Sequence, residues 1–284
     1  MPPPTGSRPQ KPAAREEIIT ISTATGAPTT EPVVDPWSAL DQELSAWAEA
    51  GMTATFWWRD DDAVMPTPTL DRLLSLSARH EVPLALAVIP AFVEDGLAGR
   101  LEGGTTATIL QHGWAHANHA PESEKKAELG DHRPPAMIGE ELGRGAARLR
   151  TLFGERFLPV LTPPWNRIGP QTTAALPGWG YAGLSTFGPR KAGGGIARTN
   201  THADIIDWRG GRDFAGDRAV LDAVCRHLAA RRAGTVDSDE PTGLLTHHLD
   251  HDAESWDFID RFLIRTRSHP AVSWRSAATL FDIG

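Results

Sequence analysis

The sequence predicts a single α/β domain in which helices cover a parallel sheet that is either closed into a barrel or wound open. Short apolar segments typical of buried strands alternate with helical segments about eight times along the chain. Polar residues gather just after these strands, at the ends where the active sites of α/β barrels lie. No internal repeat or change of composition divides residues 36–284, so we treat them as one domain.

The N-terminal segment of residues 1–35 is rich in Pro, Thr, Ala and Gly, and it has too little apolar surface to offset the entropy of ordering. We therefore expect a disordered tail over residues 1–35 and a barrel domain over residues 36–284.

The composition excludes several classes of protein. The net charge of −8 argues against nucleic-acid binding, because phosphates attract lysine and arginine. The single cysteine, Cys225, rules out an internal disulfide. No apolar run reaches the roughly 20 residues that span a bilayer, and the polar N-terminus lacks the apolar core of a signal peptide. We expect a soluble, cytoplasmic protein, whose oligomeric state the composition does not indicate.

Capping residues and apolar spacing predict the elements in order. Asp35 and Thr67 each precede a proline, in a position to cap a helix, whereas a continuous apolar run such as Leu84–Ile89 is typical of a buried parallel strand. We expect strands at Thr53–Trp58, Leu84–Ile89, Thr106–Leu110, Leu158–Leu161, Tyr181–Thr186, Ile205–Trp208, Gly243–Leu249 and Val272–Trp274. We expect helices at 36–50, 67–78, Val93–Leu101, Ile138–Phe153, Gln171–Leu176, Asp217–Arg232, Glu254–Arg267 and Ser276–Phe281.

Two long connections separate these elements. Residues 120–136 form a polar loop that is long for a compact domain, and such loops are often functional. Residues 187–202 are glycine-rich but lack the Lys-Ser/Thr pair and the following helix of a phosphate-binding loop. We interpret this second loop as a flexible lid or a plain connector.

The stretch Gln111–His119, which reads Q-H-G-W-A-H-A-N-H, holds three of the eleven histidines. His112 and His116 are four residues apart, so one helical turn would present both rings on the same face. Two neutral imidazoles and one carboxylate make a site for a divalent metal that leaves coordination positions open. The sequence Asp60–Asp62 supplies the best carboxylate, so we expect the two stretches to meet at one site.

The other polar clusters also follow predicted strands. Asp60–Asp62 come after the first strand, His112 after the third, Pro163-Pro164-Trp165 after the fourth, Asp207-Trp208 at the end of the sixth and His247-His248 late in the seventh. In a barrel, these strand ends open on one face, so the clusters would share one rim.

These motifs resemble those of the polysaccharide deacetylases, the NodB-homology or carbohydrate esterase family 4 hydrolases. The resemblance rests on the consecutive aspartates, His-x-x-x-His, the proline-aromatic turn and Leu245-x-His247, and it covers roughly residues 50–250. It implies a distorted (β/α)7 barrel. It also implies a hydrolase that removes an acetyl or similar acyl group from a sugar or glycoconjugate with a divalent metal, usually zinc.

The resemblance further implies roles for individual residues. The metal ligands would be Asp62, His112 and His116. Asp61 would be the base that activates a metal-bound water, and His247 the general acid. Trp165 stands where the backbone N–H of an aromatic residue helps to hold the oxyanion.

The chain departs from the family pattern in its first motif, where Arg59-Asp60-Asp61-Asp62-Ala63 stands in place of Thr-Phe-Asp-Asp-Gly, and at two later positions. Gly113 replaces the Ser or Thr that usually follows the first histidine. Thr162 replaces the arginine that orients the base, and Arg167 and Arg59 are candidate replacements.

Neighbouring residues in a strand point to opposite faces, so only one residue of each adjacent pair can face the site. Either Asp60 or Asp61 is the base, and either His247 or His248 is the acid. Candidates for contact with a small-molecule or glycan substrate are Trp114, His119, Trp208 and Arg59.

Two other functions fit the same residues. One is hydrolysis of a non-sugar C–N bond on the same fold. The other is a catalytically silent carbohydrate-binding barrel, motivated by Thr162 at the arginine position and by the ten tryptophans. Taken alone, each motif also has a plainer interpretation, since acidic loops and surface histidines are common.

Overall fold

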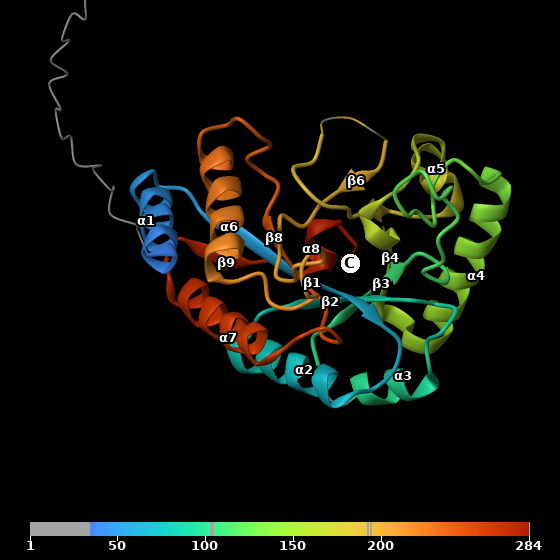
Figure 1. Cartoon of the computed structure of the whole chain (residues 1–284), viewed down its shortest axis with the longest axis horizontal. Helices are drawn as coiled ribbons and strands as arrows, with labels where there is room; N and C mark the ends of the chain where they lie inside the picture. Colours follow the sequence, from blue (N-terminus) through green and yellow to red (C-terminus); the bar gives the residue numbers. More distant parts are fainter. Residues whose placement is uncertain (1–34, 103–104, 192, 194, 284) are drawn as a thin grey trace, which may run out of the picture. The chain divides into compact units, whose positions relative to one another are not determined.

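The computed structural model describes residues 35–283 except 103, 104, 192 and 194 (Figure 1). The predicted disordered tail lies outside the described residues but for Asp35, which caps the first helix by accepting a hydrogen bond from the Ser38 N–H (3.1 Å). Among the described residues, no helix combines the length and apolar character needed to cross a membrane.

A parallel sheet forms the centre of the fold, as predicted. Its strands run in the order β6-β5-β4-β3-β2-β1-β8-β7, with β9 paired to β1. The strands are β1 (Ala54–Ala63), β2 (Leu84–Val88), β3 (Thr108–His112), β4 (Phe157–Thr162), β5 (Gly183–Leu184), β6 (Ala197–Arg198), β7 (Ala203–Asp204), β8 (Thr242–Thr246) and β9 (Val272–Trp274).

One extended segment, residues 197–204, joins the two edges of the sheet. Its first part, β6, pairs with β5, and its last part, β7, pairs with β8. Between them, the Thr201 N–H donates to the Thr186 carbonyl (3.0 Å) and the His202 N–H donates to the Gly243 carbonyl (2.8 Å). The curled sheet is thereby closed into a distorted α/β barrel, which confirms the predicted fold class.

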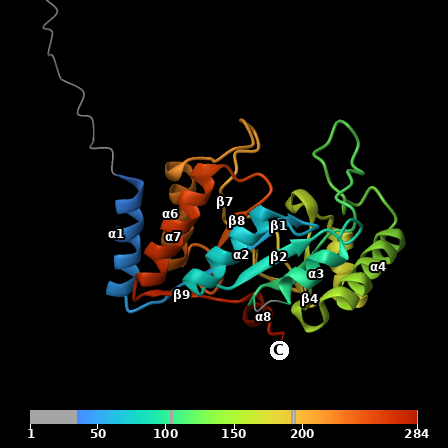
Figure 2. The same ribbon diagram turned by 90° about the horizontal axis from the view of Figure 1, so that it is seen from below.

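Helices cover the outside of the sheet (Figures 1 and 2). They are α1 (Pro36–Glu49), α2 (Pro68–His80), α3 (Asp95–Leu101), α4 (Pro135–Phe153), α5 (Pro170–Ala175), α6 (Asp217–Arg232) and α7 (Ala253–Ser268). The short C-terminal helix α8 (Ala277–Leu280) instead packs on the inner side of the sheet. The expected cap at Thr67 is confirmed, because its Oγ1 accepts a hydrogen bond from the Leu70 N–H (3.0 Å).

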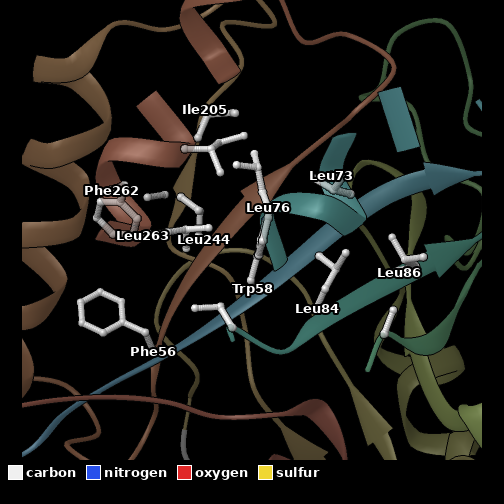
Figure 3. Packing of buried hydrophobic residues seen from close by; sticks show 14 of the residues in the cluster. Phe56, Trp58, Leu73, Leu76, Leu84, Leu86, Ile205, Leu244, Phe262 and Leu263 are labelled. Atoms are coloured by element: carbon white, nitrogen blue, oxygen red, sulfur yellow. The ribbon is translucent and has the colours of Figure 1, made fainter. Parts of the chain in front are cut away.

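Strand β1 divides the apolar core into two layers. Phe56 and Trp58 face the helices and pack in the large cluster with Leu73 of α2 and Phe262 of α7 (Figure 3). Trp57 points to the other side, into the barrel, where it packs with side chains of β2, β3, β4 and the C-terminal helix α8. Alternate residues of β1 therefore belong to different environments, and this alternation continues into the polar residues that follow.

Several strand predictions were wrong in extent. The strand expected at Tyr181–Thr186 is confined to Gly183–Leu184, and the one expected at Gly243–Leu249 ends at Thr246, before His247 and His248. Strand β1 continues beyond Trp58 to Ala63 and so includes the three aspartates. The strand expected at Ile205–Trp208 instead lies at Ala203–Asp204, and Ile205 and Ile206 are buried in the core cluster after it. The glycine-rich loop of residues 187–202 ends in the segment that closes the barrel, so part of it is structural.

Candidate metal centre

Three potential metal ligands meet at the carboxyl ends of β1 and β3. Asp62 lies near the end of β1, His112 is the last residue of β3, and His116 lies on the loop that follows. Asp62 Oδ1 is 3.2 Å from His112 Nε2 and 3.5 Å from His116 Nε2. The three ligand atoms lie within 4.8 Å of one another, a separation that suits one shared cation.

The two histidines converge through a turn of the backbone, and the expected helical turn is wrong. His112 ends a strand, and the chain then turns sharply at Gly113, whose φ is +56°. His116 itself has a φ of +52°, in the left-handed region that few residues other than glycine adopt. The spacing of four residues brings the rings together here because the loop folds back.

The donor atoms fit a divalent cation. Asp62 Oδ1 is buried and has no hydrogen-bond partner among the described residues, although buried carboxylate oxygens are normally satisfied. His112 Nδ1 lies 2.9 Å from the Thr162 carbonyl, which only accepts, so Nδ1 carries a proton there. Nε2 is therefore the His112 nitrogen that would bind a metal beside Asp62, the arrangement common in metal-ligating histidines. Burial acts to lower the pKa of His112, but Asp61 and Asp62 outweigh it and raise the pKa, so a metal at Nε2 would displace a proton.

The charges around Asp62 favour its ionised form. Burial acts to raise the pKa of Asp62, but the neighbouring His112, His247 and His116 outweigh it and hold the pKa far below its usual value. For His116, burial and the neighbouring His112 charge lower the pKa, which favours the neutral ring that binds metals.

Asp61 lies beside this cluster and is held by a buried arginine. Arg59 Nε is 2.9 Å from Asp61 Oδ1, and Arg59 Nη2 donates to Asp61 Oδ2 (3.0 Å). The same guanidinium donates to Ser185 Oγ (2.7 Å) and Asn166 Oδ1 (2.7 Å), and it is fully buried. Arg59, predicted as a substrate contact and as a candidate replacement for the missing arginine, thus lies behind Asp61 and contacts both of its carboxylate oxygens.

Asp60 points to the opposite side of β1, as strand alternation requires. Its Oδ2 accepts hydrogen bonds from Thr246 Oγ1 (2.7 Å) and the His248 N–H (3.0 Å), and its Oδ1 lies 2.5 Å from His248 Nδ1. Although burial acts to raise the pKa of Asp60, the His248 charge outweighs it and lowers the pKa, whereas Asp60 raises that of His248 against the effect of burial. Asp60 and His248 are therefore engaged with each other, which favours Asp61 and His247 as the site residues.

His247 lies on the other side of the centre, between Asp204 and Trp208. Its Nδ1 is 3.9 Å from Asp204 Oδ1, and its ring makes an edge contact with Trp208 at 4.6 Å. Trp208 Nε1 also donates to Asp204 Oδ2 (2.7 Å), and burial raises the pKa of Asp204. Asp204 was not among the residues predicted from the sequence. Asp207, which was, accepts backbone hydrogen bonds within its own turn. The available signal was the spacing of four residues between Asp204 and Trp208.

Trp165 borders the centre directly. Its ring lies 4.4 Å from the His116 ring, and its φ of +55° marks a tight turn after β4. Trp208 is 41% exposed, so an aromatic surface is available on the His247 side as well.

Three other predicted residues lie away from the ligands. Arg167 Nη1 donates to the Lys126 carbonyl (2.8 Å) on the outside of the loop. Trp114 packs against the Arg144 guanidinium, 4.8 Å from the ring centre. His119 is exposed.

A second group of potential ligands, formed by His202, His227 and Glu240, is buried elsewhere. The Gly243 N–H donates to His202 Nδ1 (3.0 Å), so a neutral His202 carries its proton on Nε2, 3.4 Å from Glu240. That nitrogen has no lone pair to offer a metal. Burial lowers the pKa of His202 and brings the pKa of His227 to about 2, and the two neutral rings stack at 3.4 Å. We interpret this group as a packed structural element.

Comparison with known proteins agrees with this fold. No family model matches the chain, and no curated protein matches it. Among solved structures, a family 4 carbohydrate esterase of Streptococcus mutans is 14% identical, with a TM-score of 0.53, over 84% of this chain and 89% of the esterase. The peptidoglycan deacetylase PdaC of Bacillus subtilis is 13% identical, with a TM-score of 0.52, over 81% and 91% of the two chains. A family 4 carbohydrate esterase of Streptomyces lividans, solved with acetate, is 14% identical, with a TM-score of 0.51, over 77% and 90%.

These likenesses show that the chain has the barrel fold of the carbohydrate esterase family 4 deacetylases.

Proposed function

We propose that this protein is a metal-dependent hydrolase that removes an acyl group, most simply acetyl, from a sugar or glycoconjugate. The observation that carries the proposal is the convergence of Asp62, His112 and His116 around a buried carboxylate oxygen that has no hydrogen-bond donor. The fold shared with deacetylases and esterases supports it.

These three residues would hold the metal, and two imidazoles with one carboxylate suit zinc among the common divalent ions. When bound, such an ion polarises a carbonyl group and lowers the pKa of water.

Asp61 and His247 would handle the protons. Asp61, kept in place by Arg59, would accept the proton of the attacking water. His247, near Asp204, would donate a proton to the leaving amine or alcohol, so that the C–N or C–O bond breaks without a free anion. The backbone N–H of Trp165 would donate to the oxyanion that forms in between.

The aromatic residues around the centre support a sugar substrate. The Trp165 ring lies 4.4 Å from the ring of the candidate ligand His116, and the Trp208 ring lies 4.6 Å from the ring of His247. Aromatic rings at such positions can stack on the apolar faces of a pyranose. The cytoplasmic location and the absence of nucleic-acid partners stay predictions from the sequence.

The main reason to consider a catalytically silent carbohydrate-binding barrel no longer applies. It was suggested by the absence of an arginine at position 162, but Arg59, two residues before Asp61 on β1, makes an ion pair with Asp61 instead. A non-sugar C–N substrate would use the same residues, so the choice depends on substrate tests.

The test combines elemental analysis of the purified protein with acetate release from a panel of N- and O-acetylated sugars. We expect one divalent ion per chain and acetate release that requires it. His112→Ala is the matched control, which should lose both. A protein that binds no metal stoichiometrically, or that keeps its metal but hydrolyses no acylated sugar or amide in the panel, would overturn the proposal.

A further inference from the structure

Glu128 lies in the long loop of residues 120–136 and makes an unusual set of contacts with the histidine loop. Its side chain is fully buried. Glu128 Oε2 accepts a hydrogen bond from the Trp114 N–H (3.0 Å), and Oε1 accepts from the Ala115 N–H (2.7 Å) and at 3.4 Å from the Ala117 N–H. One carboxylate thus binds three backbone donors between and just beyond His112 and His116.

Gly113 leaves the space that this carboxylate occupies. A Cβ atom at Gly113 would collide with Glu128 Oε2 and would lie 2.7 Å from Pro164 Cδ. The φ of +56° at Gly113 also disfavours any side chain. Gly113, where the family motif has Ser or Thr, therefore allows the Glu128 carboxylate to approach the backbone, and Glu128 holds the loop by hydrogen bonds.

The segment that carries Glu128 is itself well anchored. Leu129 is fully buried and forms a bridge with Ile168, and its carbonyl accepts the Gly169 N–H (2.9 Å). On the other side, the Ala127 N–H donates to Asn118 Oδ1 (3.0 Å), which adds a further contact with the histidine loop. Glu128 therefore connects the histidine loop to a part of the fold that is fixed independently.

His116 needs such a constraint. Its left-handed backbone conformation is unfavourable for a residue with a side chain, and it persists only where neighbouring contacts impose it. The donors bound by Glu128 come from the residues just before and after His116, in the turn that directs its ring toward Asp62.

We propose that Glu128 is a positioning residue of the metal centre, which sets the place of His116 by clamping residues 113–117. The proposal rests on the proposed function, since it takes Asp62, His112 and His116 as the ligands. Glu128 would touch neither metal nor substrate, and its effect would appear in metal affinity.

The test compares Glu128→Gln with Glu240→Gln. Both glutamates are fully buried and bind backbone donors, since Glu240 accepts from the Arg190 N–H (2.6 Å) and the Asn200 N–H (2.9 Å). In Glu128→Gln, the amide NH2 would replace one acceptor and face a backbone N–H. The dissociation constants for Zn²⁺ and Co²⁺ and the thermal midpoint of each apoprotein are measured, together with the Co²⁺ absorption spectrum.

We expect Glu128→Gln to weaken metal binding by about 10- to 100-fold and to change the Co²⁺ spectrum, as loss of supporting contacts does at other metal sites. Glu240→Gln should lower the thermal midpoint but leave the metal dissociation constant unchanged. Equal metal affinity in Glu128→Gln and wild type would overturn the inference, as would equal weakening in both variants.

A second variant guards against misfolding of the first. Gly113→Ala displaces the Glu128 carboxylate without changing any charge, and it should also weaken metal binding. Unchanged affinity in this variant would count against the clamp. If the wild-type protein binds no metal at all, the proposed function fails, which is a different result from wild-type binding that Glu128→Gln leaves unaltered.

Discussion

The ion pair between Arg59 and Asp61 offers a quantitative test of how the site is built. Replacing Arg59 with methionine keeps much of the side-chain volume but removes both contacts to Asp61, at 2.9 and 3.0 Å. It also removes the donors to Ser185 and Asn166. Because Arg59 and Asp61 are only 0% and 2% exposed, water cannot easily replace the guanidinium.

The expected loss is large. Breaking a buried ion pair by removing one partner costs about 3–5 kcal/mol, because the remaining charge is left uncompensated. This is a considerable share of the roughly 5–15 kcal/mol that stabilises a typical domain. The double variant Arg59→Met/Asp61→Asn removes both charges, so it should regain part of the free energy of unfolding that Arg59→Met loses.

Urea unfolding of wild type, both single variants and the double variant closes a thermodynamic cycle. We expect a coupling energy of about 2 kcal/mol or more in favour of the pair, within the usual range for residues in contact. A coupling energy below about 0.5 kcal/mol would refute the argument, because that is the value found for independent sites. Arg59→Met should also lose hydrolytic turnover while it retains metal.

Three further predictions follow from the same geometry. Asp61→Asn should abolish turnover with metal content unchanged, whereas Asp60→Asn should mainly lower the free energy of unfolding, by about 1–3 kcal/mol; the reverse pattern would show that the assignment of the base is wrong. His112→Ala should lose the metal and keep its circular dichroism spectrum, and full metal retention would contradict the ligand set. His227 has a pKa of about 2 because it is buried, so below pH 6.5 the unfolded chain binds a proton that the native chain does not. The contribution of His227 to stability should therefore fall by about 1.4 kcal/mol per pH unit on acidification below pH 6.5, and His227→Gln should show a shallower fall in urea midpoints; equal slopes would contradict this origin.

Local signals in the sequence predicted most helices and the meeting of Asp62 with His112 and His116. Helix α6 occupies the expected range Asp217–Arg232, and the caps at Asp35 and Thr67 form as their side chains suggested. These features depend on neighbours in sequence, so they are visible without tertiary information. The meeting of His112 with Asp62 was predictable because both follow strands of a parallel barrel, whose ends share one rim.

Features that depend on contacts between distant segments were not predictable. Glu128 gives no local signal, because its role appears only when the loop of residues 120–136 lies against the histidine loop. The closing segment of residues 197–204 was misjudged for the same reason. Its strands are two residues long and are defined by partners on opposite edges of the sheet.

The roles of the three aspartates depend on a break in strand regularity. Regular alternation would place Asp60 and Asp62 on the helix side of β1, with only Asp61 inside the barrel. The pairing of β1 with β2 shifts register between Asp60 and Ala63, and Asp62 has a φ of +70°. Such an irregularity re-aims a side chain, so that Asp62 joins Asp61 at the centre.

Because of this irregularity, the three aspartates have different partners. Asp61 remains on the regular, inward side, within reach of Arg59 two residues earlier, whereas Asp62 faces the two imidazoles. Asp60 keeps the outward direction and binds the turn after β8 that also carries His247. Since each carboxylate has partners that the other two cannot reach, one aspartate cannot substitute for its neighbour. A chain with the same three residues in a fully regular strand would place only one carboxylate at the centre, with no second group for either the ligand or the base.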